Sequence, residues 1–389
     1  MKSTTLKKWI WIHRWSSLVG MVFMLMLCLT GLPLIFAHEL DHWLGNTAEA
    51  PPMAEETPHA SIDELVRAAE RDSGGHAVRF LVEDPDDSDV WYFNMGESVD
   101  AADLSDFVGY DARTATQLSE YPLDGGIVGI LLRLHVDLFA GIYGMLFLGL
   151  MGVLMLLAIV SGVVIYAPFM RRLDFGEIRA RRARRTQWLD MHNLFGAVTM
   201  VWLAAVSLTG VINTLSIPVF EAWKATQLDE MKAPYADAKP VSALDASAEL
   251  AVRSAQASEP DMTLSFMAFP GNSFASPAHF VAFMRGNTPW RSKFFRPLLI
   301  DARTGAVVEK RDLPWFAAVL LLSQPLHFGD YGGMPLKILW ALLDILSIIV
   351  LSSGLYLWAV KKPAAAKPVK QSNVVEPQPE LAELSRESA

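Results

Sequence analysis

The sequence has little cysteine, because Cys28 is the single one among 389 residues. One thiol allows no disulfide framework, no CxxC pair and no thiolate cluster within the chain. No GxGxxG loop follows a strand-like run, so a dinucleotide-binding motif of that type is absent. The apolar segments also contain no HxxxH or HExxH pattern, which argues against the common zinc motifs within them.

Charge is missing from long parts of the chain, although 19% of all residues are charged and 52% are hydrophobic. A helix needs about 20 apolar residues to cross a bilayer. Four stretches exceed that length, and only the last contains a charged residue, Asp344. They predict four transmembrane helices, the first an uncleaved anchor because it is far longer than a signal-peptide core. The stretches are 15–37, 138–170, 191–220 and 338–360.

The net charge of −9 conceals clusters of Lys and Arg beside the spans. Basic residues precede the first span, fill the link 171–190 and follow the fourth span, so the positive-inside rule places all three in the cytoplasm. The long segments 38–134 and 217–334 then lie in the periplasm, as in a multi-pass protein of the bacterial inner membrane. The first segment is strongly acidic, which argues against nucleic acid or anionic lipid as its partner.

An internal duplication relates the two halves of the chain. His13 and His192 each open a span, and a Thr-Gly pair follows both with its threonine seventeen residues on. His135 and His327 each precede the next span, and a Ser-Gly pair follows both with its glycine twenty-seven residues on. A parallel repeat predicts a pseudo-twofold axis along the membrane normal. The matched pairs are Thr30-Gly31 with Thr209-Gly210, and Ser161-Gly162 with Ser353-Gly354.

The segments between the spans repeat as well. Each has an alanine-rich, acidic helix candidate, two strand-like runs and a turn containing Asp-Ala-Arg-Thr. The predicted fold is a membrane all-α four-helix bundle, formed by two tandem helix pairs, with two small α+β periplasmic domains. The helix candidates are 62–72 and 243–257, the strand-like runs are 77–82, 90–94, 264–269 and 279–284, and the turns are 108–114 and 299–305.

Two apolar runs, 127–132 and 315–322, are too short to span a bilayer and predict interfacial helices. The expected segments follow from these patterns. They are the first span at 8–37, the first periplasmic domain at 38–126, an interfacial helix and second span at 127–170, a basic cytoplasmic link at 171–190, the third span at 191–217, the second periplasmic domain at 218–312, an interfacial helix and fourth span at 313–361, and a disordered cytoplasmic tail at 362–389.

The duplication gives the four repeated histidines a common role. Twofold symmetry places His13 opposite His192 near the cytoplasmic face, and His135 opposite His327 near the outer face. A single histidine at a helix end is usually a hydrogen-bonded interfacial residue. Ionisable side chains at membrane depth are costly, however, and functional by default. Four of them at fixed offsets in two copies favour metal or cofactor ligation.

Haem is the cofactor that fits single histidines facing each other across a bundle, because imidazole is a standard axial ligand of haem iron. We expect one or two b-type haems. Seventeen residues of helix cover roughly 25 Å, so Gly31 and Gly210 should lie near the outer histidines, and Gly162 and Gly354 near the inner ones. These glycines would admit either a macrocycle or a neighbouring helix.

Supporting groups can also be proposed. An axial imidazole normally donates its other N–H to a carbonyl or a carboxylate, and Arg can pair with haem propionates. A solvated interfacial charge is the alternative for each candidate. Asp344 has no firm role, although it would face the bundle interior and bind a proton. The candidates are Asp190, Asp137 and Asp330 beside their histidines, and Arg14 and Arg133 for propionates.

The remaining histidines are weaker candidates. His38, after the first span, competes as an outer ligand, although neither it nor His42 has a counterpart in the second copy. We expect His59, His76 and His279 to contact solvent in the periplasmic domains.

The chain resembles the PepSY-associated transmembrane-helix family of bacterial inner-membrane proteins, from Lys8 to Lys362. The Asp-Ala-Arg-Thr turns resemble the ends of PepSY-type domains. The other matching motifs are His13-Arg14-Trp15, Leu134-His135, His192-Asn193-Leu194-Phe195-Gly196 and Leu326-His327-Phe328-Gly329-Asp330.

The family includes haem-containing reductases that deliver electrons to ferric siderophores, and iron-regulated proteins of unsettled activity. The resemblance implies that His13, His135, His192 and His327 are haem ligands and that the substrate is a ferric siderophore or another Fe(III) chelate. Some relatives carry a fused flavoprotein domain. Here a Pro-, Ala- and Glu-containing tail follows Lys362, so a separate flavin or quinol donor is expected.

Three hypotheses follow. The first is a transmembrane redox enzyme that reduces an Fe(III) chelate in the periplasm. The second is a non-enzymatic membrane module whose external domains bind a peptide, a protease or an envelope partner. The third, a metal transporter, requires a polar path across the bilayer, for which one buried carboxylate is thin support.

Overall fold

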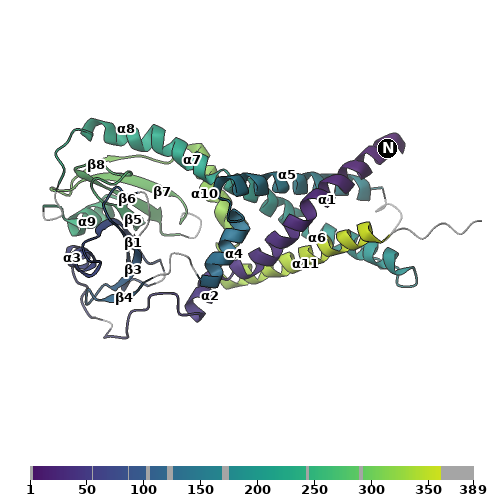
Figure 1. Cartoon of the computed structure of the whole chain (residues 1–389), viewed down its shortest axis with the longest axis horizontal. Coiled ribbons are helices and arrows are strands. Elements are labelled where there is room, and N and C mark those ends of the chain that lie inside the picture. The colour runs from purple at the N-terminus through teal and green to yellow at the C-terminus, as the bar shows by residue number, and fades with distance from the viewer. Residues whose placement is uncertain are drawn as a thin grey trace, which may run out of the picture.

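The computed structural model describes residues 3–360, apart from 55, 86, 102–105, 121–125, 169–174, 242–244 and 289–291. A group of long helices lies at one end of the molecule and an antiparallel sheet at the other (Figure 1). The predicted tail 362–389 and part of the basic link, including Arg171 and Arg172, lie outside the described residues.

Four helices are long and apolar enough to cross a membrane, and they confirm the four predicted spans. Only a helix or a closed barrel satisfies its own backbone hydrogen bonds inside a bilayer, so long apolar runs become helices there. Helix α1 packs against α5 and α11, and α6 packs against the same two helices. The spans are α1 (Ser3–Leu34), α5 (Gly141–Tyr166), α6 (Arg184–Asn213) and α11 (Gly333–Ala359).

Short helices connect the spans to the sheet, and two of them carry repeated histidines. Helix α4 (Gly126–Val136) packs on α1 and contains His135, and α10 (Trp315–Phe328) packs on α6 and contains His327. Both are longer than the predicted interfacial runs. The other connecting elements are α2 (Ala37–Trp43), α7 (Ser216–Trp223), a π-helical turn (Lys224–Leu228), α8 (Asp229–Lys232) and a 3-10 turn (Ala233–Tyr235).

The two copies of the α+β unit share one eight-stranded antiparallel sheet, with the strand order β4-β3-β2-β1-β5-β6-β7-β8. The sequence predicted two separate small domains, and the pairing of β1 with β5 makes them one. Leu81 lies opposite Met267 at the centre of that pairing. The strands are β1 (Ala77–Glu83), β2 (Val90–Gly96), β3 (Asp106–Asp111), β4 (Gln117–Glu120), β5 (Met262–Ala268), β6 (His279–Gly286), β7 (Phe295–Asp301) and β8 (Val307–Lys310).

Helices α3 (Ile62–Asp72) and α9 (Ala248–Ser258) pack on the sheet through Leu65 of α3 and through alanines of both helices, and they form one core that spans both copies. Each helix helps to cap the other. Asp63 accepts hydrogen bonds from the Ser247 hydroxyl and the Glu249 N–H, and Glu249 accepts one from the Ile62 N–H. Carboxylates satisfy the free N–H groups of a helix start, so these contacts join the two copies.

Candidate functional site

Each repeated histidine is held by a helix other than its own. The Nδ1 of His13 lies 2.8 Å from the Ala158 carbonyl oxygen and 3.2 Å from the Ser161 hydroxyl of α5. In the other copy, the Nδ1 of His192 lies 3.0 Å from both the Val350 carbonyl oxygen and the Ser353 hydroxyl of α11. These two histidines form what we call the sheet-distal pair.

The same contacts recur near the sheet. The Nδ1 of His135 lies 2.9 Å from the Thr30 hydroxyl of α1, and the His135 ring also bonds the Leu27 carbonyl. The Nδ1 of His327 lies 3.0 Å from the Val206 carbonyl oxygen and 3.2 Å from the Thr209 hydroxyl of α6. We call His135 and His327 the sheet-proximal pair.

A glycine completes each contact. In all four places the helix presents a carbonyl, a Ser or Thr three residues later, and a glycine directly after it, and we call this set a histidine cradle. A Cβ on Gly31 or Gly210 would lie 3.0 or 3.1 Å from the Cε1 of His135 or His327. The glycines therefore admit the imidazoles themselves. The cradles are Leu27, Thr30 and Gly31; Ala158, Ser161 and Gly162; Val206, Thr209 and Gly210; and Val350, Ser353 and Gly354.

The sequence placed these four glycines beside the correct histidines. Gly162 lies against His13 and Gly354 lies against His192, where added Cβ atoms would come within 3.2 and 3.5 Å of Cε1. The helical rise of about 1.5 Å per residue was sufficient to match the layers.

The cradles determine which ring nitrogen carries the proton. A carbonyl oxygen can only accept a hydrogen bond, so Nδ1 must donate. Each cradle hydroxyl donates to a carbonyl of its own helix, as Thr30 does to Met26 and Thr209 to Ala205, and is left to accept. The proton therefore resides on Nδ1, and Nε2 keeps its lone pair. Among the described residues, no hydrogen bond reaches Nε2 of any of the four histidines.

The rings of His135 and His327 lie close together, as twofold symmetry predicted for this pair. The ring centres of His135 and His327 lie 6.2 Å apart, with an angle of 65° between the ring planes. His192 lies within electrostatic reach of His13. Burial, and next the neighbouring His327, lower the pKa of His135 to about 4, so this ring is neutral at neutral pH. No three His, Cys, Asp or Glu side chains converge in the described part of the chain.

The carboxylates proposed as imidazole partners have other contacts, which corrects that prediction. Asp190 is bonded by the backbone N–H and the guanidinium of Arg179, the latter at 2.6 Å. Asp137 accepts from the Phe139 N–H, and Asp330 faces Lys293 at 3.5 Å. Carbonyl and hydroxyl groups of the cradles take the role instead, because they lie on the helix that packs against each ring.

The two proposed propionate partners lie close to aromatic rings. The Arg14 guanidinium lies 6.0 Å from the Trp15 ring centre, and that of Arg133 lies 4.9 Å from the ring centre of Phe139. Their pairing with propionates stays a prediction.

Three histidines belong to the α+β units and lie outside the pairs. His59 is exposed and bonded to Asp89 at 2.8 Å, and His76 is half-buried. His279 is 3% exposed, bonded to Ser276 and packed on Tyr235, so the expectation of solvent contact was wrong for it. Tyr235 comes from a distant turn that nothing in the β6 sequence indicated.

A further histidine motif lies outside the spans. The helix α2 reads His38-Glu39-Leu40-Asp41-His42, which has HExxH spacing. Glu39 instead pairs with Lys337 of α11 at 2.6 Å, and His42 pairs with Glu49 at 2.8 Å. The pair of Glu39 with Lys337 links α2 to the fourth span.

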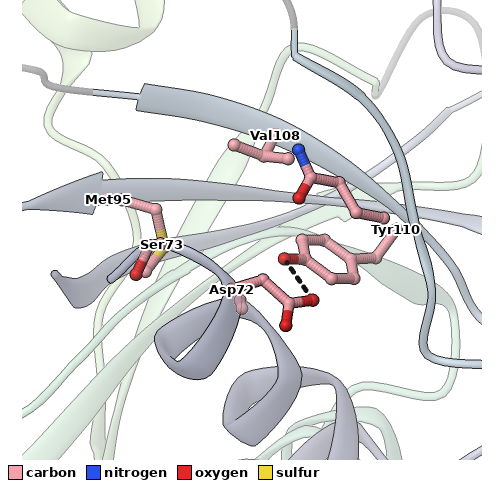
Figure 2. Close-up of a pocket in the computed structure, with 7 residues that line it drawn as sticks. Asp72, Ser73, Met95, Val108 and Tyr110 are labelled. Carbon is pink, nitrogen blue, oxygen red and sulfur yellow. Dashed lines mark hydrogen bonds between the residues drawn. The ribbon is translucent and has the colours of Figure 1, made fainter. Parts of the chain in front are cut away.

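A small cavity of about 160 Å³ lies in the first α+β copy, between the end of α3 and strands β2, β3 and β4. Figure 2 shows Asp72, Ser73, Met95, Val108 and Tyr110 around it, with the Tyr110 hydroxyl donating to the Asp72 carboxylate. Burial, and next the Asp72 charge, raise the pKa of Tyr110 to about 12. Sequence patterns gave no signal for this cavity, because its walls come from four elements.

Comparisons with known proteins place the chain in a family. A search of curated proteins finds no significant match. The profile of the family described as "PepSY-associated TM region" matches residues 10–361, which includes most of the first span, the other three spans and both copies of the α+β unit. The protein is thus a multi-pass membrane protein that belongs to the PepSY-associated TM region family.

Proposed function

We propose that this protein is a transmembrane electron carrier with two b-type haems, which reduces a ferric siderophore or another Fe(III) chelate. The sheet-distal pair, His13 and His192, would hold one iron and the sheet-proximal pair, His135 and His327, the other. The observation that supports this most is the repeated cradle, because it fixes four imidazoles with Nε2 free to coordinate.

The dimensions of the sheet-proximal pair fit one iron between two imidazoles. Metal–imidazole bonds are about 2 Å long and each ring centre lies roughly 1 Å beyond its nitrogen, which gives about 6 Å between ring centres. The separation of His135 and His327 is 6.2 Å. Imidazole nitrogens are standard axial ligands of haem iron.

Buried donors near this pair also suit a haem. The indole Nε1 atoms of Trp202 and Trp340 are buried and lack a partner among the described residues. Trp340 packs against Gly329, two residues after His327. Such N–H groups would suit the carboxylate oxygens of haem propionates.

The chain's own residues would position the redox centres. Bound haem would supply one-electron chemistry at iron. Each cradle keeps a proton on Nδ1 and presents Nε2, and its second-shell hydrogen bonds hold the ring direction. Val206 is fourteen residues beyond His192 on α6, so the two layers lie roughly 21 Å apart along that helix.

The proposed orientation follows the basic clusters. Arg181, Arg182 and Arg184 are exposed near the sheet-distal pair, and the positive-inside rule assigns that end to the cytoplasm. Electrons would enter there from a separate flavin or quinol donor. The shared sheet would lie in the periplasm of the inner membrane, where the chelate is reduced. Iron(III) prefers hard oxygen donors, so reduction weakens its hold on the chelator.

A pyridine haemochrome assay on the purified full-length protein tests this proposal. We expect b-type haem at two per chain and about one in each of the variants His135→Ala and His192→Ala. His59→Ala is the matched control, since that exposed histidine lies outside the pairs. Haem-free protein, prepared with adequate haem supply, would refute the proposal.

The cavity of Figure 2 supports a second candidate, a binding module for a periplasmic peptide or envelope partner. Its volume of about 160 Å³ suits a single side chain. A colourless preparation that retains a peptide through this cavity, and loses it in Tyr110→Phe, would favour the module over the electron carrier.

A further inference from the structure

Asp344 is a buried carboxyl group in the middle of a membrane-spanning helix. It is 5% exposed, and its Oδ2 has no hydrogen-bond partner among the described residues. An isolated charge at membrane depth is costly, so such residues mark ion or proton pathways. Packing alone gives no reason for a carboxyl group here.

Cys28 of α1 is the titratable group that faces Asp344, and its thiol donates a hydrogen bond to the carboxyl. The charged residues of α1 and α6 lie toward their ends, and α5 has none. On α11 itself, Lys337 is engaged by Glu39. Asp344 therefore has no permanent cation beside it in the described spans. The charged residues near the ends of α1 and α6 are Lys7, Lys8, Arg14, Arg184, Arg185 and Asp190.

The carboxyl group lies between the two histidine layers. Cys28 directly follows Leu27 and precedes Thr30 by two residues, and these two groups hold His135. Asp344 precedes Val350, whose carbonyl holds His192, by six residues. Cys28, the residue that Asp344 contacts, therefore lies in the same helical turn of α1 as Leu27 and Thr30. One turn of helix is about 5 Å long.

We propose that Asp344 binds one proton when an electron reaches the sheet-proximal histidine pair. This inference rests on the proposed haem function. A ferric haem core with two neutral imidazoles carries one positive charge, and the ferrous core carries none, so reduction removes the only charge that would stabilise an ionised carboxylate nearby. The reaction is balanced: the donor supplies one electron, which would convert one ferric iron to ferrous iron, and hydronium gives one proton to the Asp344 carboxylate, which leaves the carboxylic acid and water.

Potentiometric titration of the haem-loaded protein at several pH values tests this proposal. In the wild type we expect the potential of one centre to fall with rising pH, by up to about 59 mV per tenfold change in proton concentration. Asp344→Asn should remove that dependence at unchanged haem content, and Asp344→Glu should restore it. Ser347→Ala is the matched control, because Ser347 is buried one turn away and bonds its own helix.

Redox-difference infrared spectra supply a second readout. Reduction should produce a carboxylic-acid carbonyl band in the wild type that Asp344→Asn lacks. Full haem content with the same pH dependence in Asp344→Asn, or no pH dependence in the wild type, would overturn this inference alone. A wild-type protein that binds no haem would overturn the proposed function as well.

Discussion

The two copies of the repeat agree closely in the spans and differ in the elements around them. Each copy supplies two cradles of the same composition, a carbonyl, a hydroxyl residue and a glycine, at the same offsets from its histidines. The threonine cradles hold the sheet-proximal pair and the serine cradles hold the sheet-distal pair.

The two copies differ at sites that are present in one copy only. Asp344 is seventeen residues beyond His327, and the residue at that offset from His135 is Gly152. A Cβ on Gly152 would meet Val211 at 2.8 Å, so that interface is closed to any carboxyl group. In the α+β units, Tyr110 of the cavity corresponds to Ile300, the residue that also precedes the aspartate of the Asp-Ala-Arg-Thr turn.

The histidine cradles are constrained by the symmetry of the repeat, whereas Asp344 and the Tyr110 cavity are not. A metal between two facing imidazoles requires both copies to keep the same geometry, whereas a single carboxyl group or cavity does not. Equivalent substitutions in the cradles should therefore have equal effects in both copies. Substitutions at a site found in one copy should have no matching effect in the other copy.

The largest effect is expected for Gly31→Leu, which places a side chain where the His135 ring lies. The variant should lose the sheet-proximal haem and keep the other, and Gly210→Leu should do the same. Haem content per chain measures both. Gly20→Ala is the control, since its Cβ would meet nothing closer than 3.7 Å. Loss in only one of the two leucine variants would break the symmetry argument.

A smaller effect is expected when a cradle hydroxyl is removed. Thr30→Val and Thr209→Val leave each ring bonded to its carbonyl, so haem affinity should weaken by about tenfold, the lower end for second-shell changes. The rate of haem transfer to an acceptor apoprotein measures the loss. Equal rates for the two variants would sharpen the comparison. An unchanged rate in both would show that the carbonyl alone fixes the ring.

The joint between the α+β copies can be tested through Asp63, which accepts two hydrogen bonds at the start of α9. Asp63→Ala should cost about 1–2 kcal/mol, as lost helix caps do. Hydrogen exchange of β1 and β5 should rise together, because these strands pair. Glu64→Ala is the control, since that side chain is in the same helical turn but exposed. Faster exchange in β5 alone would contradict the shared core.

The smallest expected effect concerns acid sensitivity. The Arg113 guanidinium bonded to Asp111 holds the pKa of that carboxyl below its usual range. A lowered pKa means that the pair stabilises the fold above about pH 4, the ordinary Asp value, and that this contribution fades as pH falls. Asp111→Asn should flatten the acid dependence of β3 exchange.

The matching turn in the second copy provides the contrast. Asp301 is bonded by Thr304, whereas the Arg303 side chain is exposed. Asp301→Asn should therefore alter acid dependence less than Asp111→Asn. The opposite order would show that the ion pair of the first copy adds nothing.

The spans and the histidine layers were predictable because they depend on local composition and on helical rise. A charge-free stretch must be a helix in a bilayer, and seventeen residues of helix have a known length, so Gly31 could be assigned to the level of His135. The motif that holds each ring was visible as a Thr-Gly or Ser-Gly pair, although its hydrogen bonds were not foreseen.

The rest depended on contacts between distant segments. Nothing in β1 indicates that β5 pairs with its free edge, so one sheet was mistaken for two domains. The carboxylates Asp190, Asp137 and Asp330 are close to their histidines in sequence, but a neighbour on a helix seldom faces the same partner. His279 was expected in solvent because Tyr235, which covers it, lies far away in the chain.

The pairing of Leu81 with Met267 lies at the centre of the sheet and has a further consequence. One half of this chain, taken alone, contains a free β1 edge, one member of each histidine pair and both cradles for its own rings. It would complete the edge and both pairs by associating with an identical half. The present molecule is thus organised like a homodimer whose two halves are joined in one chain, and this linkage allows a residue such as Asp344 to occur in one half only.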